Sequence, residues 1–242
     1  MNGILYNSEI WQKLSEKDKM DLMKIDKYLL KSILGAHSKV PSEQLHLETG
    51  TLSIPQIIAT RRMIYLQTIL KRPEGELIRN IYEAMRDDPI SGDWCEQVKN
   101  YFEKINLHMS EEHIRPIDEE QFKALIKNRV REESFKEFKD MQGNHKKGKH
   151  IHHENLRRPQ EYLTTNKLNN KQESLLFNLR CQSVRNIKDN FHQQFTNNLL
   201  CNLCKKEIDN QEHILQCHVL QEHIKWNHEE IKYDQIYGSL EQ

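Results

Sequence analysis

The stretch "SIPQIIATRRMIYLQTIL", residues 53–70, combines a helix start signal with apolar side chains at helical spacing. Ser53 is a favourable N-cap, and no glycine or proline interrupts the segment after its first turn. The side chains expected on its buried side are Ile57, Ile58, Ile64, Tyr65 and Ile69. The segment therefore predicts a long helix that contributes to a hydrophobic core.

The composition extends this prediction to the whole chain. Of the 242 residues, 30% are charged and 7% are aromatic, and the chain contains only 8 glycines and 6 prolines. This balance favours helices with wide solvated faces over β-sandwiches and barrels. We expect an all-α fold, in one or two domains.

Helix start and stop signals recur on both sides of residues 53–70. Ser15 precedes Asp18 by three residues, which is close to a capping box, and Gly35 ends that helix. Pro41 and Gly50 bracket a second, shorter helix. Further helices are expected at about 74–85, 93–105 and 118–141, and from Asn170 onward.

The spacing of apolar residues also predicts which side chains are buried. In the first helix these are Leu22, Ile25, Leu29 and Ile33. In the helix at 118–141 they are Phe122, Ile126 and Val130, and in the last helix Leu175, Leu176 and Leu179.

The stretch "CNLCKKEIDNQEHILQC", residues 201–217, gathers three of the five cysteines and a histidine. The spacing of Cys201 and Cys204 lets two thiolates approach one ion from the same side. His213 and Cys217 lie four residues apart, on one face of a helical turn. Three thiolates and one imidazole suit tetrahedral Zn²⁺ and leave no open position for a catalytic water. The cluster predicts a structural zinc site.

The alternative is a chance arrangement, in which a CxxC redox pair lies beside a helix with a buried histidine and cysteine. A redox pair is expected in a βαβ context, and no such strands are predicted, so zinc is favoured. His218, His223 and His228 follow the cluster. We interpret them as solvated helix residues because four ligands already saturate zinc.

The formal net charge of zero conceals an uneven distribution of charge. Residues 144–206 carry 12 Lys and Arg against 4 Asp and Glu, whereas residues 207–242 carry 2 against 8 and residues 1–143 carry 22 against 24. The middle block is therefore strongly basic and would attract a polyanion.

Within this block, "GNHKKGKHIHHENLRRP" at residues 143–159 has almost nothing to bury and is interpreted as an exposed basic loop. Its candidate phosphate-binding residues are Lys146, Lys147, Lys149, Arg157 and Arg158. The helix that follows is expected to present further basic side chains on its outer face: Lys171, Arg180, Arg185 and Lys188.

Two patterns resemble catalytic motifs, and both are better explained as helix residues. Asp87 and Asp88 resemble a polymerase metal-binding pair, but they close a helix and Pro89 follows. Asp118 with Glu137 and Lys139 resembles a nuclease set, but that set needs adjacent strands and these residues lie in a helical segment.

No apolar run is long enough to span a membrane, and the N-terminus lacks the order of charge and apolar residues found in a signal peptide. We expect an intracellular protein, nuclear or cytoplasmic, with no membrane partner.

The segments "ILYNSEIWQKL", "IDKYLLKSILG", "LHLETGTLSIPQIIATRRMIYLQTIL" and "CNLCKKEIDNQEHILQC" occur in this order between residues 4 and 217. Together they resemble the C-terminal part of non-LTR (LINE-type) retrotransposon reverse transcriptases, over nearly the whole chain. The resemblance implies thumb-like helices, of which that around 57–70 would lie near template and primer, and a C-terminal CCHC zinc knuckle. It also implies an RNA or RNA–DNA partner, and an association with the missing polymerase portion.

The resemblance implies that the fingers and the catalytic palm are absent, so this chain alone is not expected to polymerise DNA. The spacing of the ligands also differs from the retroviral knuckle, because eight residues separate Cys204 from His213, so retroviral base recognition does not transfer.

We expect a thumb-like helical region at 1–90, a helical connector at 91–143, a basic linker and helix at 144–200, the zinc knuckle at 201–220 and an acidic tail at 221–242. The leading hypothesis is a nucleic-acid-binding C-terminal fragment of a reverse transcriptase. The alternative is a helical protein-interaction module with a structural zinc site, and a nuclease is a distant third.

Overall fold

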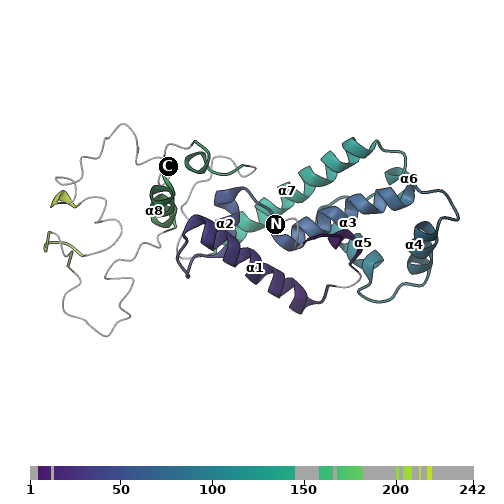
Figure 1. Cartoon of the computed structure of the whole chain (residues 1–242), viewed down its shortest axis with the longest axis horizontal. Helices are drawn as coiled ribbons and strands as arrows, with labels where there is room; N and C mark the ends of the chain where they lie inside the picture. Colours follow the sequence, from purple (N-terminus) through teal and green to yellow (C-terminus); the bar gives the residue numbers. More distant parts are fainter. Residues whose placement is uncertain are drawn as a thin grey trace. The chain divides into compact units, whose positions relative to one another are not determined.

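The structure is a computed structural model that describes residues 5–11, 14–144, 158–165, 168–181, 200–201, 204–208, 213 and 217–219. These residues form eight α-helices and two short 3-10 helices, with one isolated β-bridge and no strand among them (Figure 1). The predicted all-α class is confirmed for this part of the chain. Within it, no helix has both the length and the apolar character that crossing a membrane requires.

The helices are α1 (Glu16–Leu34), α2 (Ser42–Thr49), α3 (Ile54–Leu70), α4 (Leu77–Asp87), α5 (Trp94–Lys104), α6 (Glu111–Ile114), α7 (Glu119–Gly143) and α8 (Asn170–Arg180), with η1 (Ser8–Ile10) and η2 (Glu161–Leu163). The chain divides into two compact units. The first holds residues 1–28 and 51–138, and the second holds residues 29–50 and 139–242. The boundary predicted at residue 90 therefore falls inside the first unit.

The first unit is built around α3, the helix predicted from residues 53–70. Its buried Met63 and Leu70 belong to one core with Trp94 and Val98 of α5 and with Phe122 of α7. Ile126 and Val130 continue this core along α7, which confirms the face predicted for that helix. On α3 itself Ile58 and Ile69 are buried, whereas Ile57, Ile64 and Tyr65 are half-buried.

Two arginines of α3 hold the N-terminal segment in this unit. Arg62 is fully buried, and its guanidinium donates to the Gln97 side chain at 2.6 Å and to the Trp11 carbonyl. Arg61 donates to the carbonyl of Leu5 and to Ser8 Oγ. Both guanidinium groups are therefore used for internal structure.

Most helix starts lie where local sequence predicts them. Ser15 and Asp18 exchange hydrogen bonds at the start of α1, Ser53 and Gln56 form a capping box at α3, and Asp93 accepts from the Glu96 N–H. The last helix differs slightly, because Asn169 rather than Asn170 caps α8. The predicted helix at about 74–85 begins at Leu77, and the short α6 was not predicted.

The predicted buried face of α1 is only partly right: Leu22 and Leu29 are half-buried and Leu22 packs against a core, but the prediction is wrong at Ile25 and Ile33. Ile25 is 41% exposed and Ile33 is 73% exposed, whereas Leu30 and Leu34 are buried. The reason lies in Asp26, which is buried and accepts a hydrogen bond from Ile54 N at 3.1 Å, at the start of α3. The helix turns the Asp26 carboxylate inward because it satisfies the backbone N–H of Ile54, which has no partner within α3. The spacing of hydrophobic residues does not predict this contact.

In the second unit α8 contacts α2 and the end of α1. Phe177 is fully buried with Leu30, Leu34 and Leu45 in one core. On α8 the predicted Leu179 is buried and Leu176 is half-buried, but Leu175 is 51% exposed, so that prediction is wrong. Gly35 ends α1 with φ +57°, and a Cβ there would meet Ser174 Oγ at 2.3 Å. The turn after α1 thus needs glycine for both its conformation and its packing.

Candidate metal centre

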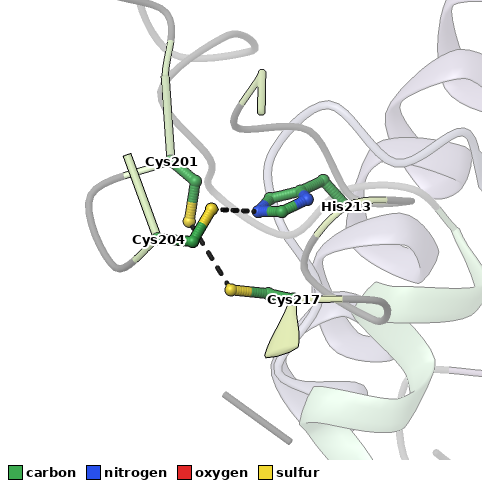
Figure 2. A group of neighbouring side chains, drawn as sticks. All are labelled: Cys201, Cys204, His213 and Cys217. Atoms are coloured by element: carbon green, nitrogen blue, oxygen red, sulfur yellow. Dashed lines mark hydrogen bonds between the residues drawn. The ribbon is translucent and has the colours of Figure 1, made fainter. Parts of the chain in front are cut away.

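The four residues predicted as metal ligands converge in the structure (Figure 2). Their ligand atoms all lie within 4.8 Å of one another. The sulfur atoms of Cys201 and Cys217 are 3.9 Å apart, and Cys204 Sγ is 3.2 Å from His213 Nε2. Cys201, Cys217 and His213 are buried, and Cys204 is half-buried. The cluster could hold a metal ion.

A tight turn places the first two cysteines. The Cys201 carbonyl accepts from Lys205 N at 2.8 Å, and Cys201 N donates to the Glu207 carbonyl at 2.6 Å. An antiparallel bridge between Leu200 and Ile208 closes the turn, and Lys205 adopts a positive φ of 59° within it. The local backbone thus brings both thiols to one side without help from distant residues.

The backbone of this turn also favours a thiolate. The N–H of Lys206 points at Cys204 Sγ from 3.5 Å and, with the N–H of Glu207, lowers the pKa of the Cys204 thiol to about 6. Hydrogen bonds to the charged form of a group favour that form. Because a thiolate rather than a thiol binds a metal, Cys204 is prepared for ligation near neutral pH.

His213 contacts a carboxylate that the sequence analysis did not identify, that of Glu207. Its Nδ1 lies 2.9 Å from Glu207 Oε2, while its Nε2 faces Cys204. The sequence contains only a weak signal for this contact, because Glu207, Asp209 and Glu212 all lie between the cysteine pair and the histidine. The spacing of these acidic residues does not indicate that Glu207 contacts His213, and the folded turn shows it.

The predicted nucleic-acid-binding residues fall into three groups. Arg158 and Lys171 are exposed, as a phosphate-binding side chain must be. Arg180 was predicted on the outer face of its helix, and this prediction is wrong. Its side chain is 5% exposed and pairs with Glu48 at 2.7 Å. The others lie outside the described residues: Lys146, Lys147, Lys149, Arg157, Arg185 and Lys188.

The residues on either side of the basic segment are both bonded to α2. Gln142 donates to the Gln44 side chain at 2.9 Å, and Gln160 N donates to the Glu48 carbonyl at 2.9 Å. The backbone of Arg158 also passes so close to Gly50 that a Cβ there would meet it at 2.4 Å. The described residues on both sides of this segment therefore lie against α2.

The carboxylates of the two patterns that resemble catalytic motifs do not converge on a metal site. Asp118 precedes α7 and Glu137 lies on the same helix 19 residues later, about 28 Å along the axis. Glu137 instead pairs with Lys104. Asp87 and Asp88 lie at the exposed end of α4, and the described residues place no metal-binding group around them. Among the trailing histidines His218 is exposed, whereas His223 and His228 lie outside the described part.

Comparison with known proteins found no match to this chain among family models, curated proteins or solved structures.

Proposed function

We propose that the Cys201, Cys204, His213 and Cys217 cluster holds a structural Zn²⁺ ion in a nucleic-acid-binding protein. The observation that carries the proposal is the convergence of four soft or borderline ligand atoms from two short segments. Four protein ligands complete the coordination of zinc, so the ion would stabilise the fold of the turn rather than activate water.

The separations between ligand atoms are close to those of a tetrahedral zinc site, and all four atoms lie within 4.8 Å of one another. Bond lengths of about 2.3 Å to sulfur and about 2.0–2.1 Å to nitrogen put tetrahedral ligand atoms about 3.5–3.8 Å apart. The two observed separations, 3.9 Å and 3.2 Å, lie on either side of that range. Small side-chain rotations would satisfy the geometry, and the ligand set excludes the hard cations Mg²⁺ and Ca²⁺, which prefer oxygen.

The nucleic-acid role is supported by the basic block and by its attachment. Residues 144–206 carry 12 basic against 4 acidic side chains. The flanks of its most basic segment are bonded to one helix, at Gln142 and Gln160, which keeps the ends of the segment together. Cations that lie between two ends held at one helix are close together along the chain, and several such cations can neutralise one phosphate backbone.

By its resemblance to LINE-type reverse transcriptases, this chain would represent the C-terminal region of such an enzyme. Its helices would then act as thumb and connector, and its knuckle and basic segment would bind RNA or an RNA–DNA duplex. The chain alone would be inactive as a polymerase, because the resemblance covers no catalytic palm.

The salt dependence of RNA binding tests the nucleic-acid role. Alanine at Lys146, Lys147, Lys149, Arg157 and Arg158 should weaken RNA binding for all sequences and reduce the slope of log affinity against log salt by up to about four units. The matched control replaces five exposed lysines of the first unit: Lys17, Lys24, Lys99, Lys127 and Lys136. Equal affinity and slope in the parent and the first variant would contradict the proposal.

The second candidate is a protein-interaction module, and one observation favours it. On α4 and just beyond it, Leu77 is 76% exposed, Ile81 50% and Ile90 73%. Leu77 and Ile81 are four residues apart and share one face of α4, and contiguous exposed apolar side chains often belong to protein interfaces. Failure of RNA binding, together with an intact zinc site, would favour this candidate.

A further inference from the structure

The histidine of the metal centre has one ring nitrogen toward the cluster and the other toward a carboxylate. Nε2 of His213 lies 3.2 Å from Cys204 Sγ, and Nδ1 lies 2.9 Å from Glu207 Oε2. A neutral imidazole carries one proton, so one nitrogen donates and the other offers a lone pair. A carboxylate only accepts hydrogen bonds when ionised, so the proton belongs on Nδ1 and the lone pair on Nε2.

We propose that Glu207 is a positioning residue of this metal centre. Its carboxylate accepts from the Nδ1–H of His213, fixes the ring orientation, and selects the tautomer whose Nε2 can bind the ion. Carboxylate partners of this kind also make the histidine more basic, so that its Nε2 lone pair binds a metal ion more strongly. The inference rests on the proposed zinc site and adds a fifth residue to it.

The same turn that holds the thiols also places Glu207. Its carbonyl accepts from Cys201 N, and the next residue, Ile208, forms the bridge with Leu200. The backbone at Glu207 is therefore set by the cysteine turn, and the side chain reaches His213 from there. This contact, like those between the ligand side chains, joins the cysteine turn to the segment that holds His213.

The exposure of Glu207 sets the expected size of the effect. Its side chain is 68% exposed, so water competes for the carboxylate. Loss of an outer partner of a metal ligand typically weakens metal binding by about 10–100-fold, and an exposed partner belongs at the lower end. We expect about a 10-fold loss for Glu207→Ala.

The experiment compares the full chain with Glu207→Ala, Glu207→Gln and the control Glu161→Ala, which removes an exposed carboxylate outside the site. Zinc affinity is measured by competition with a chromophoric chelator under reducing conditions. Glu207→Ala should bind zinc about 10-fold more weakly. Glu207→Gln should recover part of the loss because its amide oxygen still accepts from Nδ1–H, and Glu161→Ala should match the parent.

Nitrogen-15 NMR of the zinc-loaded parent reads the tautomer directly. The inference predicts that Nδ1 of His213 is protonated and Nε2 binds zinc. Coordination through Nδ1, or equal zinc affinity in the parent and Glu207→Ala, would overturn the role of Glu207 while leaving the zinc site standing. A parent chain that binds no zinc would instead overturn the proposed site itself.

Discussion

The buried guanidinium of Arg180 is balanced by the carboxylate of Glu48, which lies 132 positions earlier in the sequence. Burial disfavours the charged guanidinium, and the carboxylate of Glu48 outweighs this and raises the pKa of Arg180. Tyr162 completes the group, because its hydroxyl donates to Glu48 Oε2 at 3.1 Å and its ring lies 5.8 Å from the guanidinium carbon. This buried network joins α8 and the segment before it to α2.

Replacing Arg180 with Met should be strongly destabilising. It would leave the fully buried Glu48 carboxylate without its cation, and loss of one partner of a buried ion pair costs about 3–5 kcal/mol. The double variant Glu48→Gln with Arg180→Met should recover much of this loss because no charge then stays buried. Urea unfolding measures both, with exposed Lys171→Met on the same helix as the control. An Arg180→Met chain as stable as Lys171→Met would contradict the assignment.

Asp26 makes the stability of the first unit depend on pH. Burial raises the pKa of its carboxyl to about 6 in the folded chain, whereas the unfolded value is 3.8. The folded state therefore holds this proton more tightly, so stability is greatest below the unfolded pKa. It declines as pH rises from about 4 to about 6.

Asp26→Asn removes this titration and keeps an oxygen that can accept from Ile54 N. Relative to the parent, the variant should gain on the order of 2 kcal/mol in unfolding free energy between about pH 4 and about pH 7. Urea unfolding at both pH values measures the difference in unfolding free energy between the variant and the parent. Titratable groups that both chains contain contribute equally and cancel in this difference. A difference that stays constant with pH would show that burial does not raise the pKa of Asp26 in the folded chain.

At the scale of single elements, local signals predicted helix ends better than helix faces. The caps at Ser15, Ser53 and Asp93 depend on residues three positions away, so the sequence alone reveals them. The buried faces of α1 and α8 depend on partners far along the chain. The sequence analysis therefore did not predict that Asp26 turns inward to Ile54 N, or that Arg180 turns inward to Glu48.

The metal cluster was predictable for the same reason. Cys201 and Cys204 are placed by one turn, and His213 and Cys217 by their four-residue spacing, so the ligand set is a local property of the sequence. The contact of Glu207 was not predictable, because the sequence places three acidic residues near His213 and spacing alone does not indicate which of them reaches its ring.

At the scale of the whole molecule, helices make up most of the described residues, and the proposed zinc centre belongs to the C-terminal part of the sequence. The first unit has its own extensive core, with residues such as Met63, Phe122 and Ile126 fully buried. The described part of the turn at 200–208 is held by short backbone bonds, by the ligand cluster and by the contact between Glu207 and His213. Loss of the ion should therefore disturb the C-terminal part and leave the helices of the first unit folded.

Elemental analysis of the purified chain under reducing conditions shows directly whether the cluster holds zinc. We expect about one zinc per chain in the parent and in Cys95→Ser, whose cysteine lies outside the cluster. Cys204→Ser should lose the zinc and retain most of its helical circular dichroism. A parent chain without metal, or a Cys204→Ser chain that holds zinc as tightly as the parent, would contradict the proposed zinc site.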